Sequence, residues 1–272
     1  MKNAQAFFTD QDACCATGVL FYERLHACTM EGEPHEMRGL MPPERSIPWM
    51  PSLRRRTLLT LAVAAVGGWA LRGAQAWDES LLHSQMASRF GAAGSRRLQA
   101  WLEMLRTQSG LSVAQQLQAV NAFWNQQLLA SEDLQIWNET DYWATPLESL
   151  GKGAGDCEDF VIGKFVSLVR LGVPAQNMRL IYVRARMGGI GSTQSIAHMV
   201  LGFYETPQAE PLVLDNLVSS IQLASLRTDL TPVFSFNAQG IYVRGERSAP
   251  SDRINRWQDL QQRMRKEGFD AL

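Results

Sequence analysis

Three residues of the types used in covalent catalysis follow one another along the chain: Cys157, His198 and Asp215. A thiol nucleophile needs a thiolate, an imidazole that moves protons, and a third group that orients the imidazole. Each residue alone also has an ordinary structural role, as a buried thiol, a core histidine or a turn former. Together they predict a Cys-His-Asp hydrolase or acyltransferase.

Cys157 follows a glycine-rich stretch, GKGAGD, and directly precedes a predicted helix at 158–171. The start of a helix exposes backbone N–H groups and the positive end of the helix dipole, which lower the pKa of a thiol and stabilise an oxyanion. Glycines let the backbone turn tightly and leave room for a substrate. We therefore expect the nucleophile at the start of this helix.

His198 and Asp215 lie on successive strand-like segments, at 196–203 and 211–215. Turn-forming residues separate the two segments, so they can pair antiparallel. Such a pair would present both side chains on one face of a sheet. We expect the helix of Cys157 to pack against that face.

Three acidic residues, Asp156, Glu158 and Asp159, flank Cys157. One explanation is that the helix dipole favours acidic residues at an N-cap and in a first turn. Carboxylates raise the pKa of a neighbouring thiol, however, so the alternative is a bound cation that offsets their charge. Oxygen ligands suit Ca²⁺ rather than zinc, although the sequence has no EF-hand pattern.

The order of helical and strand-like patterns predicts an α+β fold. Apolar residues recur at helical spacing before Cys157, and strand-like runs bounded by Gly, Ser and Pro follow its helix. We expect N-terminal helices and a nucleophile helix packed on an antiparallel sheet. The expected helices are 95–107, 112–129, 158–171 and 253–267, and the expected strands are 178–184, 196–203, 211–214, 233–236 and 240–243.

The segment 50–76 has the pattern of a secretory signal peptide. Three consecutive arginines precede a short apolar run, and Ala-Gln-Ala at 74–76 fits a signal-peptidase site. Both Sec and twin-arginine export are compatible with this pattern. Because Met50 would be a normal start, we interpret 1–49 as a mis-extended N-terminus or a leader. The expected domain is 77–272, in which Cys157 is the only cysteine.

The composition excludes several classes of protein. Lys plus Arg number 26 and Asp plus Glu number 27, a formal net charge of −1, so no basic field favours nucleic acid as a partner. Four cysteines in 272 residues do not form a disulfide scaffold. A hydrophobic content of 46% excludes a wholly disordered chain.

The segment DYWATPLESLGKGAGDCEDFVIGKFVSLVRLGVP, with AHMVL and VLDN after it, resembles the bacterial transglutaminase-like cysteine proteinases of the LapG type. The resemblance covers most of the expected domain. It implies a periplasmic protease with a papain-like or transglutaminase-like core. It also implies that Cys157 is the nucleophile, that His198 is the general base and then acid, and that Asp215 orients the imidazole.

The same resemblance implies a cofactor and partners. Calcium ligands of the family match Asp156 and Glu158, with Asp159 as a third candidate. The family cleaves the N-terminal region of a large cell-surface adhesin beside a di-alanine, which releases the adhesin and disperses biofilm. An inner-membrane receptor that senses cyclic di-GMP holds the protease inactive. An exposed tryptophan helps this docking, and Trp143 is the candidate here.

Two other functions are compatible with the residues. A transglutaminase or amidase would use the same triad and the same thioester but a different acceptor, so the reaction products distinguish it from a protease. A non-catalytic periplasmic module would bind Ca²⁺ structurally through Asp156 and Glu158. The reactivity of the Cys157 thiol distinguishes such a module from an enzyme.

Overall fold

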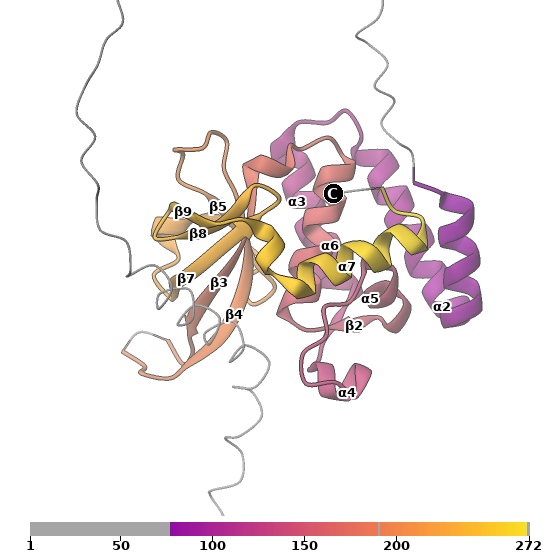
Figure 1. Cartoon of the computed structure of the whole chain (residues 1–272), viewed down its shortest axis with the longest axis horizontal. Helices are drawn as coiled ribbons and strands as arrows, with labels where there is room; N and C mark the ends of the chain where they lie inside the picture. Colours follow the sequence, from indigo (N-terminus) through magenta and orange to yellow (C-terminus); the bar gives the residue numbers. More distant parts are fainter. Residues whose placement is uncertain (1–76, 190, 271–272) are drawn as a thin grey trace, which may run out of the picture.

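The computed structural model describes residues 77–189 and 191–270. The expected leader and signal peptide, at 1–49 and 50–76, lie outside these residues. Helices form one side of the molecule and an antiparallel sheet forms the other (Figure 1). This arrangement confirms the α+β fold expected from the sequence, while the domain boundaries stay a prediction.

The helical side is built mainly from amphipathic helices around the central helix α6, which packs against α3, α5 and strand β4. Figure 1 shows α7 running from the sheet across to the helical side. Within the described residues, no helix combines the length and apolar character needed to cross a membrane. The helices are α2 (Glu79–Gln108), α3 (Val113–Gln127), α4 (Asp133–Trp137), α5 (Pro146–Lys152), α6 (Cys157–Arg170) and α7 (Asn255–Glu267).

The main sheet is antiparallel, with strand order β6-β5-β4-β3-β7-β8-β9. A separate short parallel pair, β1 (Leu129–Ala130) with β2 (Ala154–Gly155), fixes the backbone just before Cys157. The strands of the main sheet are β3 (Met178–Arg186), β4 (Ser195–Phe203), β5 (Leu212–Leu214), β6 (Gln222–Leu223), β7 (Leu230–Asn237), β8 (Gly240–Val243) and β9 (Glu246–Ala249).

Helix α2 begins well before the helix expected at 95–107. Gly91 interrupts it with φ of 65° and ψ of −156°, a conformation that glycine adopts without steric cost. The Ser95 hydroxyl donates to the Gly91 carbonyl over 2.9 Å just after this kink. The sequence therefore predicted the part of α2 that follows the kink, and the part that precedes Gly91 was missed.

A buried serine joins three helices. Ser167 Oγ accepts hydrogen bonds from Trp101 Nε1 at 2.8 Å and from Trp124 Nε1 at 2.9 Å, and it donates to the Gly163 carbonyl at 2.7 Å. A Cβ at Gly163 would lie 2.5 Å from the Trp124 ring, so only glycine permits this approach. The contact fixes α6 against α2 and α3.

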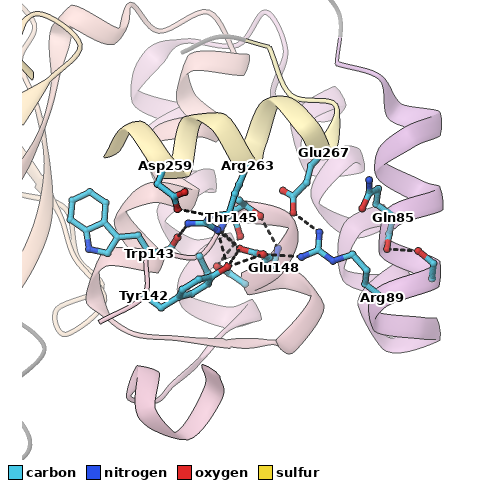
Figure 2. A network of polar contacts seen from close by, with 12 residues as sticks. Gln85, Arg89, Tyr142, Trp143, Thr145, Glu148, Asp259, Arg263 and Glu267 are labelled. Atoms are coloured by element: carbon cyan, nitrogen blue, oxygen red, sulfur yellow. Dashed lines mark hydrogen bonds and ion pairs between the residues drawn. The ribbon is translucent and has the colours of Figure 1, made fainter. Parts of the chain in front are cut away.

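Helix α5 is held in place by the carboxylate of Glu148, which is 5% exposed (Figure 2). It accepts from Arg89 of α2 at 2.8 Å and from Arg263 of α7 at 2.6 Å. It also accepts from the Tyr142 hydroxyl at 3.0 Å and from the Thr145 backbone N–H at 3.0 Å. Thr145 is the N-cap of α5, and its backbone N–H is one of the donors to Glu148. The Glu148 carboxylate therefore also positions the segment that precedes α5.

Helix α6 also buries a lysine. Lys164 is 0% exposed, and its Nζ has no hydrogen-bond partner among the described residues. Burial lowers the pKa of Lys164 to about 7, although the negative charge of Asp215 acts to raise it. The amine therefore costs folding free energy wherever the unfolded chain would carry it protonated in water.

Substitution of Ser167 by Ala will leave two buried indole N–H groups without an acceptor. We expect the free energy of unfolding to fall by about 2–4 kcal/mol, measured by urea denaturation. Ser88→Ala removes an exposed hydroxyl from α2 and serves as the control, with a change of about 0.5 kcal/mol or less. A Ser167→Ala protein as stable as the control would contradict the role given to this hydroxyl.

Lys164→Met will stabilise the protein in a pH-dependent way. Between pH 7 and 10.5 the unfolded chain binds more protons at this lysine than the folded chain does, so wild-type stability rises with pH in this window. The variant lacks this dependence, so its advantage is on the order of 4 kcal/mol at pH 7 and disappears above about pH 10.5.

Urea denaturation of both proteins across this pH range tests the expectation. The matched control is Lys152→Met, which removes an exposed ammonium group. Parallel stability curves for Lys164→Met and the wild-type protein would show that the buried amine does not titrate as described.

Candidate active site

A cavity of about 350 Å³ lies beside the start of α6. Cys157 and His198 both line it, so the structure brings together two of the residues selected from the sequence. The other lining residues come from the segment after α3, from the residue directly before α6, from β4 and from the segment after β5. They are Ala130, Ser131, Glu132, Gln135, Asp156, Ile196, Ala197, Asn216 and Leu217.

Cys157 is the first residue of α6, as the sequence predicted. The Asp156 side chain caps the helix by accepting from the backbone N–H groups of Glu158 at 3.1 Å and Asp159 at 3.4 Å. The Cys157 thiol lies 2.7 Å from Glu158 Oε2, to which it donates. A Cβ at Gly155 would lie 2.7 Å from the Asp159 side chain, so the last glycine before the nucleophile is needed for packing.

His198 and Asp215 meet in the buried part of the site. His198 Nε2 lies 2.8 Å from Asp215 Oδ1, and both side chains are almost fully buried. The expected antiparallel pairing of their strands is confirmed by the register of β4 with β5, in which Leu201 lies opposite Leu214. Asp215 follows β5 directly, so this pairing places its carboxylate beside the imidazole.

The Asp215 carboxylate is held in its ionised form. Burial acts to raise the pKa of Asp215, but the hydrogen bond and charge of His198 outweigh it and lower this pKa. The backbone N–H of Leu217 donates to Oδ1 at 3.0 Å and contributes in the same direction. An ionised Asp215 can orient the imidazole and stabilise its protonated form.

Arg227 completes this arrangement and was missed in the sequence. Its Nη2 lies 2.7 Å from Asp215 Oδ2, and its Nε and Nη2 also contact the Asp229 carboxylate at 3.0 and 2.8 Å. The Arg227 side chain is only 3% exposed. A single arginine in an irregular segment carries no motif, so its position could be found only from the fold.

Three buried aspartates form a cluster at the start of α6. Carboxylate oxygens of Asp133, Asp156 and Asp159 lie within 4.8 Å of one another. Glu158 is not in this group, since its carboxylate accepts from Cys157. Asp133, the first residue of α4, was missed because it lies far from the cysteine motif in the sequence.

The aspartate cluster has the chemistry of a hard-cation site. Backbone N–H groups hold two of the carboxylates, from Ala144 to Asp159 at 2.8 Å and from Tyr142 to Asp133 at 2.6 Å. Asp159 Oδ2 is buried and has no hydrogen-bond partner among the described residues. Burial, followed by the charges of Asp156 and Asp133, raises the pKa of Asp159 well above its usual value. These oxygens fit Ca²⁺, whose charge would relieve the repulsion.

Trp143 does not lie on an exposed surface, and this corrects our expectation of a docking residue. Its side chain is 3% exposed and stacks on Phe236, with ring centroids 5.8 Å apart. The backbone carbonyl of Trp143 accepts from Arg263 at 2.5 Å. Packing against the sheet therefore accounts for this aromatic side chain.

A comparison with protein families gives a match for this chain. Residues 99–231 match the family described as bacterial transglutaminase-like cysteine proteinase, BTLCP. No sequence among the curated proteins matches the chain.

Solved structures of LapG from Legionella pneumophila are similar to the chain at 38% sequence identity. One LapG structure has a TM-score of 0.59 and covers 68% of this chain and 95% of its own. The calcium-bound form has a TM-score of 0.58 and covers 68% and 98%, and the EGTA-treated form has 0.59 and covers 68% and 96%. With the family match and the helix-on-sheet fold, these similarities show that the chain belongs to the bacterial transglutaminase-like cysteine proteinases.

Proposed function

We propose that this cysteine protease is a calcium-dependent endopeptidase whose catalytic residues are Cys157, His198 and Asp215. The observation that carries the proposal is the geometry of one cavity. Cys157 and His198 both line it, and His198 is hydrogen-bonded to the buried Asp215. This arrangement supplies the nucleophile, the base and the orienting group that a thiol protease requires.

The mechanism follows from these groups. Since His198 Nε2 is bonded to Asp215, its Nδ1 is the ring nitrogen that exchanges a proton with the Cys157 thiol. The thiolate attacks the scissile carbonyl, and a backbone N–H at the start of α6 stabilises the oxyanion. Protonated His198 then gives its proton to the leaving amine, and the thioester forms. Water activated by the same imidazole hydrolyses the thioester and restores the thiol.

We assign the calcium ligands to Asp133, Asp156 and Asp159, with Asp133 replacing Glu158 in the set inferred from the sequence. A bound Ca²⁺ would supply positive charge beside the thiol and favour the thiolate over the thiol. The Glu158 carboxylate accepts a hydrogen bond from the Cys157 thiol. The negative charge of Glu158 therefore opposes formation of the Cys157 thiolate. The calcium-bound form of the similar LapG supports calcium as the cation.

The substrate and control that we propose rest on membership of the LapG-type family. The substrate is the N-terminal region of a large surface adhesin, cleaved beside a di-alanine in the periplasm, which leads to biofilm dispersal. An inner-membrane receptor for cyclic di-GMP is the inhibitory partner. The similarity to Legionella pneumophila LapG across 95% of that chain supports this proposal.

The purified full chain will cleave an adhesin N-terminal fragment beside a di-alanine in the presence of calcium. EGTA will suppress cleavage, and Cys157→Ala will abolish it because the nucleophile is absent. His198→Ala will lower kcat/KM by roughly 10²–10⁴-fold. Mass spectrometry of the products is the measurement.

An isopeptide link or a deamidated glutamine, without cleavage of the chain, would instead identify amine transfer or amidase chemistry. An intact panel of di-alanine peptides would contradict the proposed specificity. Cleavage by Cys157→Ala at the wild-type rate would show that Cys157 is not the nucleophile.

Asp133→Asn will weaken calcium binding at least roughly tenfold, because the site loses one of its negatively charged ligands. Isothermal titration calorimetry with CaCl₂ measures this effect without any substrate. Glu139→Gln is the matched control, since it removes an exposed carboxylate just beyond α4. Equal calcium affinity in the two variants would show that Asp133 is not a ligand.

A further inference from the structure

The sheet carries a second cavity, of about 340 Å³, that shares no residue with the active-site cavity. Its apolar lining includes Ile181, Val183, Val200 and Val213, which form a small hydrophobic cluster separate from the main core. An apolar cavity with a few convergent polar groups is the usual form of a small-ligand site. Strands β3, β4, β5, β7 and β8 all contribute to its wall.

The charged residues that line this cavity are all positive: Arg179, Arg227 and Arg244, with no aspartate or glutamate. Arg179 lies between two tyrosine rings, 4.7 Å from the centroid of Tyr204 and 3.8 Å from that of Tyr242. Within the described residues, neither Arg179 nor Arg244 forms an ion pair with a carboxylate. The wall of the cavity is therefore mostly apolar and carries positive charge, and the tyrosine rings hold the guanidinium of Arg179 in place.

The third arginine joins this cavity to the catalytic centre. Arg227 lines the second cavity, and its Nη2 lies 2.7 Å from Asp215, which in turn holds His198. Arg227 Nη1 is buried without a hydrogen-bond partner among the described residues. Its guanidinium charge is thus shared among Asp215, Asp229 and the wall of the second cavity.

We propose that the second cavity binds a small carboxylate with an apolar body, and that its occupancy is coupled to Asp215 through Arg227. The volume suits a ligand of on the order of ten non-hydrogen atoms, which is the size of a medium-chain fatty acid. The apolar body packs on the valine and isoleucine side chains, while the carboxylate pairs with Arg179 and Arg244. A ligand of this size is smaller than a folded partner and leaves the active-site cavity open.

The coupling follows from the shared positive charge. A carboxylate paired with Arg179 and Arg244 also lies in the field of Arg227, which lines the same cavity and binds Asp215, so the bound carboxylate and Asp215 each weaken the interaction of the other with Arg227. Binding of the ligand therefore loosens the positioning of Asp215 against His198. By reciprocity, removal of the Asp215 charge strengthens ligand binding.

Calorimetry with octanoate on the purified full chain tests the site without reference to catalysis. We expect one saturable site, with acetate and n-octanol binding at least roughly tenfold more weakly because each lacks one half of the recognised chemistry. Arg179→Met and Arg244→Met will each weaken octanoate binding roughly tenfold. Arg184→Met is the matched control, because Arg184 is an exposed arginine of the same strand β3 that does not line the cavity.

The coupling is tested by the same measurement on Asp215→Asn, in which octanoate will bind several-fold more tightly than in the wild-type protein. Three results would overturn the proposal: absence of saturable octanoate binding, equal binding of octanoate and n-octanol, or equal affinities in the Arg179, Arg244 and Arg184 variants. An unchanged affinity in Asp215→Asn would overturn the coupling. None of these outcomes affects the protease assignment, because the binding measurements do not depend on catalytic turnover.

Discussion

The structure depends on the concentration of buried negative charge at the start of α6. Asp133, Asp156 and Asp159 bring their carboxylates within 4.8 Å of one another away from water. Like charges in such a setting repel strongly and are tolerated only with hydrogen-bond donors or a cation. The N–H groups of Tyr142 and Ala144, which precede α5, supply part of this compensation. A cation bound beside the nucleophile would offset the remaining repulsion among these carboxylates.

The buried carboxylate of Asp215 faces a different environment. It has two cationic or potentially cationic partners, His198 and Arg227, which lower its pKa and favour the ionised carboxylate. The two acidic sites near the thiol therefore differ: Asp215 is paired with positive or potentially positive groups, whereas the aspartate cluster gathers carboxylate oxygens. Cys157 lines the same cavity as Asp156 and His198, so the charge of its thiol depends on both sites.

The parts predictable from the sequence are those specified by local patterns. The α6 start at Cys157 and the pairing of β4 with β5 follow from glycines, turn residues and short apolar runs. Asp133 and Arg227 were not predictable, because each joins the site through contacts between segments distant in the chain. Trp143 was assigned to the surface from the family resemblance, and its position in the sequence did not indicate its burial.

The hydrogen bonds of Glu148 connect the surroundings of the active site to distant parts of the chain. They join α2, α5 and α7, and Arg89 also pairs with Glu267, 178 residues further along the chain, at 2.5 Å. Contacts of such separation require closure of a long loop, which costs chain entropy. The segment before α5, which supplies N–H groups to the aspartate cluster, is therefore held through Glu148 by α2 and α7, the first and the last of the described helices. The start of α6 is thus fixed by contacts within its own first turn, whereas its surroundings depend on contacts among α2, α5 and α7.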